Sequence, residues 1–151
     1  MQLEGQFTVS ADRERVYAFL TDPHQVSRHM PDIQDVTVDD PDHFTVKARV
    51  GVAHIKGTMV MKLAITDRQP PVGTTVTGKG SGMASVVDMV TSFVLVPIDG
   101  GGTEVRWRGD VTVSGKLAAF GAQGLLERMA GKNVDTFVAG IKRGIDADTP
   151  A

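Results

Sequence analysis

The chain contains no cysteine in its 151 residues, which excludes disulfide bonds, a thiolate nucleophile and a cysteine-ligated metal site. Neither sign of charge dominates, because 16 Lys and Arg stand against 18 Asp and Glu and give a net charge of −2. The basic excess typical of nucleic-acid-binding proteins is missing, so no nucleic-acid partner is expected. No apolar run approaches the roughly 18 residues of a membrane-spanning helix, so at most a peripheral membrane contact is expected.

The first residues also lack the basic segment and apolar run of a secretory signal peptide, so the expected location is cytoplasmic. Apolar residues make up 41% of the chain and charged residues 23%, as in soluble globular proteins. The length predicts a single domain over residues 1–151, large enough to bury a sizeable core. Aromatic residues are few, with one Trp, one Tyr and six Phe, which is compatible with a void between packed elements.

The last stretch, from Lys116 to about Ile145, has the apolar spacing of one long amphipathic helix. Its apolar positions are Leu117, Phe120, Leu125, Met129, Val134, Phe137, Val138, Ile141 and Ile145. Five glycines fall inside the same stretch, and each costs about 1 kcal/mol relative to alanine. Such a helix is stable only when a large apolar surface holds it, so the upstream chain is expected to form a sheet that does so.

Upstream of this helix, apolar and polar residues alternate over most of the chain, which predicts strands. The first strand covers residues 3–9, and two short helices follow, the second of which ends before Pro31. Six more strands are expected near residues 33–38, 44–50, 55–66, 76–82, 85–96 and 105–113. Short turns join these strands, which indicates an antiparallel meander. The fold class is therefore α+β, with a seven-stranded antiparallel sheet covered by the long C-terminal helix.

Several segments resemble one family in the order in which they occur. They are residues 1–9 (MQLEGQFTV), 15–23 (RVYAFLTDP), 47–51 with 55–58, the glycine strand 78–82 (GKGSG), 101–103 and 115–118. This set resembles the CoxG family of carbon monoxide dehydrogenase subunits, which belongs to the START/Bet v 1-like (SRPBCC) superfamily. The resemblance implies a helix-grip fold, in which a curved sheet wraps the C-terminal helix around a deep apolar cavity.

The same resemblance implies a non-catalytic accessory role beside a molybdenum hydroxylase of the carbon monoxide dehydrogenase type, with a quinone or lipid as ligand. It supplies no catalytic residue, no cofactor and no metal site. Two features depart from the family pattern. Residues 28–32 (RHMPD) stand where members often carry Cys or small residues with Pro-Gly, and the chain lacks the C-terminal extension that reaches the membrane in some members.

The candidate ligand site combines small, flexible and aromatic residues. Three glycines share one face of the strand at 76–82, which either lets the long helix approach closely or keeps space for a ligand. The methionines either fill the core or line a cavity for a flexible apolar molecule. Trp107 faces inward by alternation, as a core wall or as a ligand contact, and His29 is a candidate contact to a polar head group. The predicted ligand-binding residues are Met30, Met59, Met61, Gly78, Gly80, Trp107, Phe120, Leu125, Met129 and His29.

Two other readings stay open. Alternation places Asp88 on the inward face of its strand. Asp88 with His29 or His54 is the one candidate acid–base pair that the sequence offers for a cyclase or dehydratase. The opposite face of that strand then carries Val87, Met89, Phe93 and Leu95, an exposed apolar patch suited to a homodimer or a partner protein. A shift of one residue in the register would exchange these two faces.

Overall fold

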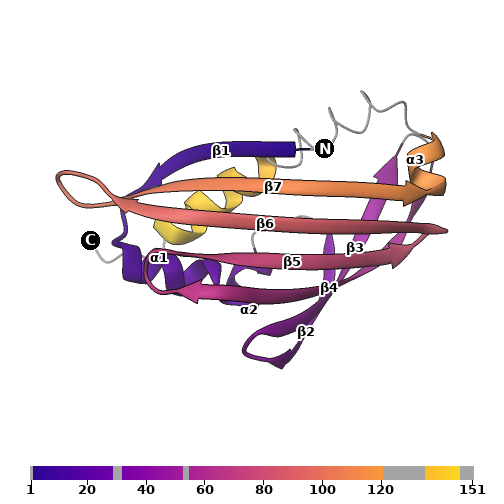
Figure 1. Ribbon diagram of the computed structural model, residues 1–151, viewed down its shortest axis with the longest axis horizontal. Coiled ribbons are helices and arrows are strands. Elements are labelled where there is room, and N and C mark those ends of the chain that lie inside the picture. The colour runs from indigo at the N-terminus through magenta and orange to yellow at the C-terminus, as the bar shows by residue number, and fades with distance from the viewer. Residues whose placement is uncertain (1, 29–31, 53–54, 121–134, 147–151) are drawn as a thin grey trace.

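The computed structural model describes residues 2–28, 32–52, 55–120 and 135–146, without the side chains at 50–52, 55 and 120. Its elements are β1 (Gln2–Val9), α1 (Arg13–Leu20), α2 (Pro23–Arg28), β2 (Ile33–Asp40), β3 (His43–Val52), β4 (Ile55–Gln69), β5 (Gly73–Gly82), β6 (Ser85–Pro97), β7 (Thr103–Gly115) and α3 (Lys116–Phe120). Residues 135–146 are also helical (Figure 1). The two short helices after the first strand are confirmed. Of the predicted long helix, both described ends are helical, and residues 121–134 lie outside the described part.

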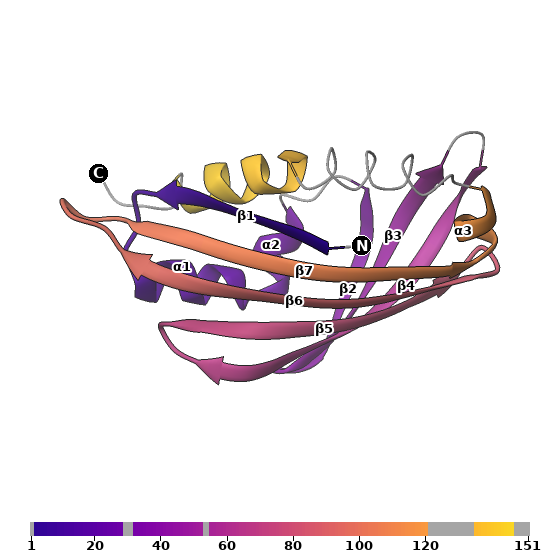
Figure 2. The same cartoon turned by 45° about the horizontal axis from the view of Figure 1, so that its top comes forward.

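All seven strands form one antiparallel sheet in the order β1-β7-β6-β5-β4-β3-β2. Strands β2 to β7 follow each other as a meander, and β1 pairs with β7 at the far edge. Figure 2 shows that β3 and β4 run steeply across the direction of β6 and β7, so the sheet is strongly twisted and curved. The predicted seven-stranded sheet is therefore confirmed, and its curvature gives it an inner face.

Helix α1 is held in place at its N-terminus. Asp12 caps it, because the Asp12 carboxylate accepts a hydrogen bond from the Arg15 backbone N–H at 2.9 Å. The buried Thr103 hydroxyl donates to the Ala11 carbonyl oxygen at 2.8 Å, which ties the start of the helix to the start of β7. The side of α1 that carries Val16, Tyr17 and Phe19 is buried. The helix therefore lies fixed against one end of the inner face.

Most of the buried apolar residues of the described part form two separate clusters, and Val46 and Ile65, each 5% exposed, belong to neither. The larger, here the α1 core, joins α1, the sheet and helix 135–146, and consists of Val9, Ala11, Val16, Tyr17, Phe19, Phe93, Leu95, Val105, Ile141 and Ile145. The smaller, here the α3 core, consists of Met59 and Leu117 with Met83, Val87 and Val113 packed against them. Most domains have one contiguous core with smaller satellites. Here a stretch of the sheet between the two cores belongs to neither of them.

The faces of β6 are the reverse of those predicted. Phe93 and Leu95 are 9% and 1% exposed, whereas Val90 and Val94 are 49% and 47% exposed. The outward patch that included Val87, Met89, Phe93 and Leu95 is therefore wrong, and the surface expected for a homodimer or adaptor is lost with it. Valines occupy both faces of β6, so alternation alone does not choose between them. The pairing of Phe93 with Trp107 on β7 fixes the register.

The inward position predicted for Asp88 is wrong for the same reason. Asp88 is exposed and lies opposite Lys79 of β5 on the outer face of the sheet. A carboxylate in water beside a lysine avoids the desolvation cost that an inward position would bring.

Candidate ligand-binding site

The inner face between the two cores is built from β4, β5 and β6. Along β4, Met61 and Leu63 follow Met59 of the α3 core on the same face. Across β5 they are paired with Gly80 and Gly78. Along β6, Met89 lies between Val87 of the α3 core and Phe93 of the α1 core, and it pairs with Gly78. We call Met61, Leu63, Gly78, Gly80 and Met89 the floor.

The glycines of the floor are required by the side chains that lie across them. A Cβ atom on Gly80 would collide with the sulfur of Met61. A Cβ atom on Gly78 would lie 2.6 Å from Cδ2 of Leu63 and 3.2 Å from Cε of Met89. The atoms nearest to these glycines therefore belong to long, flexible side chains of the floor itself. Because Met has three rotatable bonds, this surface can change shape under a ligand.

Apart from Gly80, which is buried, the floor residues are more exposed than the buried residues of the cores on either side. Met61, Leu63, Gly78 and Met89 are partly exposed, whereas Met59 in the α3 core is only 3% exposed. Partly exposed apolar side chains on the inner face of a curved sheet have the character of the wall of a ligand site. The floor is thus the part of the described inner face that is best suited to contact an apolar molecule.

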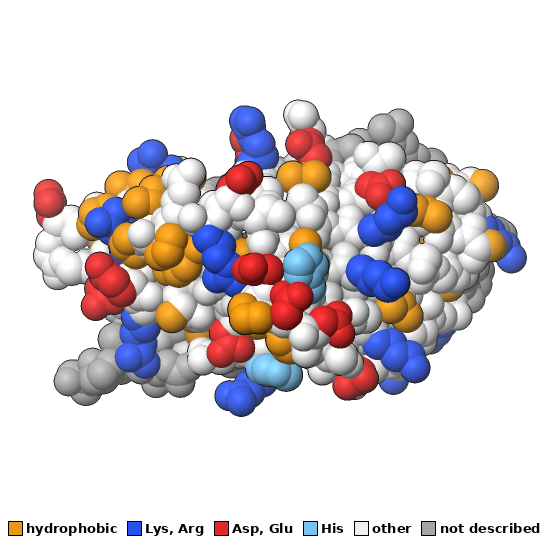
Figure 3. All heavy atoms as spheres, turned by 60° about the horizontal axis from the view of Figure 1, so that its bottom comes forward, with side chains coloured by type: hydrophobic (Ala, Val, Ile, Leu, Met, Phe, Trp, Pro, Cys, Tyr) orange, Lys and Arg blue, Asp and Glu red, His pale blue; other side chains and the backbone are white. Residues whose placement is uncertain are grey.

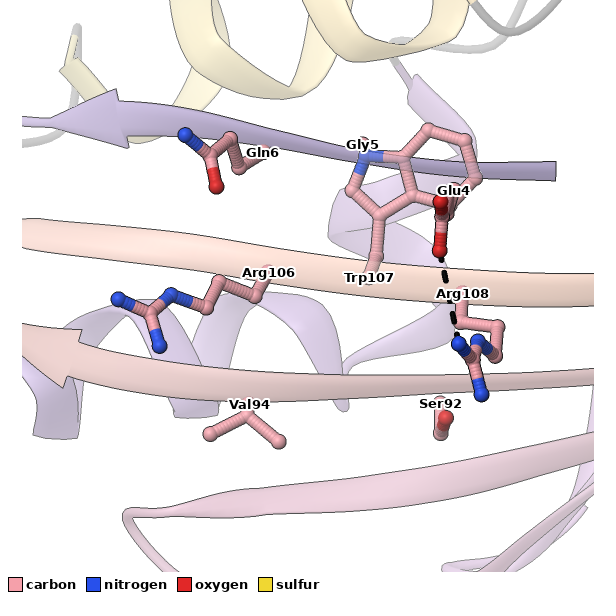
Figure 4. A pocket seen from close by; sticks show the side chains of 8 residues that line it. All are labelled: Glu4, Gly5, Gln6, Ser92, Val94, Arg106, Trp107 and Arg108. Atoms are coloured by element: carbon pink, nitrogen blue, oxygen red, sulfur yellow. Dashed lines mark ion pairs between the residues drawn. The ribbon is translucent and has the colours of Figure 1, made fainter.

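Trp107 forms the neighbouring wall. It is partly buried and packs against the α1 core, so its predicted inward orientation is confirmed. A Cβ atom on Gly5 would lie 2.9 Å from Cζ2 and 3.0 Å from Nε1 of the indole, which shows that the ring lies flat over β1 (Figure 4). Gly5 has the same role for Trp107 that Gly78 and Gly80 have for the floor.

The predicted site residues fall into three groups. The structure brings Met61, Gly78 and Gly80 together in the floor, and Trp107 beside the α1 core. Met59 belongs to the α3 core with Leu117. The remaining positions lie outside the described part of the chain: His29, Met30, Leu125, Met129 and the side chain of Phe120.

Two inner-face residues were not singled out from the sequence. Tyr17 of α1 is 7% exposed, and its ring meets the Phe93 ring edge-on with centroids 6.2 Å apart. Its hydroxyl is buried and has no hydrogen-bond partner among the described residues. Thr91, between Met89 and Phe93 on β6, is partly exposed. The spacing of α1 shows that Tyr17 faces the core, but the absence of a partner for its hydroxyl is a tertiary property with no sequence signal.

The outer face of the sheet carries charged side chains, in contrast to the floor, beside the exposed valines Val60, Val90 and Val94. Lys47, Arg49, Lys62 and Lys79 are exposed on β3, β4 and β5, and Lys62 lies directly opposite Lys79. Figure 3 shows Lys and Arg side chains spread over one side of the molecule, with Asp and Glu side chains among them. A second hollow of about 260 Å³ opens here, lined by His43, Lys62, Leu63, Ala64, Thr77, Gly78 and Lys79.

A larger open hollow of about 660 Å³ lies over β1, β7 and β6 (Figure 4). Its side chains Glu4, Gln6, Arg106, Arg108, Ser92 and Val94 share the outer face, as the strand pairing requires. Glu4 and Arg108 form an exposed ion pair at 3.5 Å. Leu63 and Gly78 of the floor also line the smaller hollow, and Trp107 also lines the larger one. Most of the other side chains that line the two hollows are polar, so the apolar floor is the better candidate for an apolar ligand.

Two ionisable groups of the described residues, His43 and Asp40, have shifted pKa values, and neither belongs to the floor. The hydrogen bond between Nδ1 of His43 and the Asp40 carboxylate, 2.8 Å long, raises the pKa of His43 and lowers that of Asp40. Both residues are exposed at the β2–β3 turn. Within the described ranges, no three His, Asp or Glu residues are grouped to hold a metal ion. No helix of the described part is long and apolar enough to cross a membrane.

Comparison with models of known protein families shows the family of this chain. The model of the CoxG family, which describes the CoxG subunit of carbon monoxide dehydrogenase, matches residues 5–146. The chain belongs to the CoxG family. No curated protein matches the chain.

Solved structures show the same fold at low sequence identity. A conserved protein from Geobacillus kaustophilus has a TM-score of 0.86 at 24% identity, over 96% of this chain and 95% of that one. A START superfamily protein from Mycobacterium smegmatis has a TM-score of 0.76 at 13% identity, over 98% of this chain and 99% of that one. The Zhui aromatase/cyclase from Streptomyces sp. R1128 has a TM-score of 0.75 at 17% identity, over 100% and 96%. The helix-grip fold of the START/Bet v 1-like superfamily is thereby confirmed.

Proposed function

We propose that this CoxG-family protein binds an apolar small molecule, a quinone or a lipid, over the floor on the inner face of its sheet. The observation that supports this function is the partly exposed apolar floor that lies between the α3 core and the α1 core. Each 100 Å² of apolar surface withdrawn from water contributes about 2.5 kcal/mol, so a ligand that covers such a floor gains affinity without any charged contact. The flexible thioethers of Met61 and Met89 suit a ligand with a chain of variable shape.

We further propose that the protein serves a molybdenum hydroxylase of the carbon monoxide dehydrogenase type, as the name of its family indicates. An accessory protein of this kind handles the apolar molecule and leaves the redox chemistry to the enzyme. A cyclase reaction receives no support, because Asp88 lies on the outer face and no described ionisable side chain belongs to the floor. The similarity to an aromatase/cyclase, at 17% identity, concerns the fold.

Ligand binding is tested first on the purified protein itself. Native mass spectrometry detects a bound molecule, and solvent extraction followed by mass spectrometry identifies it. A co-purifying quinone or lipid is the expected result. Partnership is tested separately, by co-sedimentation of the protein with a purified molybdenum-containing carbon monoxide dehydrogenase, and the absence of any complex would remove that half of the proposal.

The position of the ligand is tested with a matched pair of variants on β5. Gly80→Phe places a ring on the floor, whereas Ser81→Phe places the same ring on the exposed outer face of the same strand. Trp107 is the single tryptophan, so a quinone that binds beside it quenches the intrinsic fluorescence. Titration with 2-hexyl-1,4-naphthoquinone is expected to quench the wild type and Ser81→Phe equally and Gly80→Phe at least tenfold more weakly. Equal quenching of all three folded proteins would refute this site.

A further inference from the structure

The buried hydroxyl of Tyr17 is the one polar side-chain atom of the described residues that is both sealed from solvent and without a hydrogen-bond partner. Buried hydroxyl groups in folded proteins are almost always paired, and an unpaired one costs free energy. A phenylalanine side chain would fill nearly the same space without that cost. The hydroxyl therefore calls for a function that apolar packing does not supply.

Tyr17 lies at the margin of the α1 core that adjoins the floor. Its ring packs edge-on against Phe93 at a centroid distance of 6.2 Å and an interplanar angle of 62°. Phe93 is 9% exposed, more than any other buried member of the α1 core, and Trp107 is its direct partner on β7. Along β6, Thr91 and then Met89 of the floor follow Phe93 on the same face.

A second hydroxyl group stands at the same margin. Thr91 is partly exposed on the inner face, and its side chain forms no hydrogen bond within the described part of the chain. It lies opposite Gly109, where a Cβ atom would come within 3.3 Å of Oγ1 of Thr91. Neither hydroxyl has a partner among the described residues, and Thr91 is the next inner-face residue of β6 after Met89 of the floor. A few polar groups of this kind orient the polar end of a ligand in an otherwise apolar site.

The surroundings restrict the chemistry of that polar end. All the other side chains of the α1 core are apolar, so a charged group placed there would lose its hydration without compensation. A phenol hydroxyl readily donates a hydrogen bond, and the matching group on an uncharged molecule is a carbonyl oxygen.

We infer that the Tyr17 hydroxyl donates a hydrogen bond to a carbonyl oxygen of the bound apolar molecule, with Thr91 beside it as a second donor. The ligand class is thereby an uncharged carbonyl compound with an apolar body, such as a quinone, a ketone or an ester. This inference rests on the proposed function, since it assigns the polar end of the molecule that covers the floor. The sequence alone points to His29 for that contact.

The test compares two probes of nearly equal shape in two proteins. 2-Hexyl-1,4-naphthoquinone carries two carbonyl oxygens, and 2-hexylnaphthalene carries none. Tyr17→Phe removes only the hydroxyl and keeps the ring against Phe93, so the variant is expected to fold with an unchanged or higher Tm. Calorimetric titration is expected to show about 3- to 10-fold weaker binding of the quinone to Tyr17→Phe, the usual range for one hydrogen bond, and unchanged binding of the naphthalene.

Infrared spectroscopy gives a second readout that needs no variant. The carbonyl stretching frequency of the quinone is expected to fall on binding to the wild type relative to the same quinone in hexane, and to return toward the hexane value in Tyr17→Phe. Equal quinone affinity and an equal frequency in both proteins would overturn the role of Tyr17 while leaving the floor as the binding site. If the wild type bound neither probe, the proposed function itself would fail.

Discussion

The carboxylate of Asp146 accepts two hydrogen bonds from Ser10, one from the backbone N–H at 3.2 Å and one from the hydroxyl at 3.0 Å. These bonds join the end of β1 to the end of helix 135–146, across 136 positions of sequence. The helix therefore has a polar attachment to the sheet edge in addition to the packing of Ile141 and Ile145 in the α1 core.

We expect Ser10→Ala and Asp146→Ala each to lower the free energy of unfolding by about 0.5–1.5 kcal/mol, the net value of such hydrogen bonds. Urea unfolding followed by circular dichroism measures the change. The double variant should lose less than the sum of the two single variants, because each single variant already removes the same hydrogen bond between the Ser10 hydroxyl and the Asp146 carboxylate. Strict additivity would show that the two residues act independently.

The reversed faces of β6 lead to a second prediction on adjacent residues. Phe93→Asp buries a carboxylate in the α1 core and is expected to abolish cooperative folding, whereas Val94→Asp places it on the outer face and should change stability by less than about 0.5 kcal/mol. Thermal unfolding of the two variants distinguishes them. The opposite order of stabilities would restore the arrangement in which Asp88 faces inward and Phe93 outward.

Strand β6 also shows that the sequence predicts the strands but not which face of each strand is buried. The period of two is strong in β3, β4 and β7, so the number of strands and their antiparallel order could be predicted. In β6, Val86, Val87, Val90 and Val94 suit either face, and the choice depends on which aromatic neighbour lies across the strand. That pairing is long-range, because Phe93 meets Trp107 only after β7 has docked.

The candidate site was predictable to a similar extent. Glycines on one face of a strand indicate that something lies close to it, and Gly78 and Gly80 do lie under neighbouring side chains. The sequence did not show that these side chains are Met61 and Leu63, since a cross-strand register decides it. Nor did it show that Met59 and Met61, two residues apart on one face, belong to different surroundings.

The ion pair between His43 and Asp40 at the β2–β3 turn predicts that its contribution to folding stability depends on pH. The hydrogen bond to Asp40 raises the pKa of His43, so the stability that His43 contributes is present below its unfolded value of about 6.5 and is lost as pH rises through the folded value. The lowered pKa of Asp40 gives stability above about pH 4 that is lost as pH falls. The pair therefore acts between about pH 4 and 6.5.

Nuclear magnetic resonance titration of the His43 ring should give a pKa above the ordinary value in the wild type. The pKa should fall in Asp40→Asn, which removes the charge. Because His43 and Asp40 are both exposed, the fold and ligand binding should not change with this titration.

Substitutions of Met59 and Met61, two residues apart on β4, distinguish an effect on core packing from an effect on ligand binding. Met59 is 3% exposed and packs with Leu117, so Met59→Ala leaves a cavity in the α3 core and is expected to cost about 2–5 kcal/mol of stability. Met61 is partly exposed over Gly80, so Met61→Ala should cost less than half as much. Its main effect should be on binding of 2-hexyl-1,4-naphthoquinone, because the proposed site places this thioether against the ligand. Urea unfolding and quenching of Trp107 on the same samples measure both quantities. If Met59→Ala weakened binding more than Met61→Ala at temperatures where both are folded, the ligand would lie over the α3 core and not over the floor.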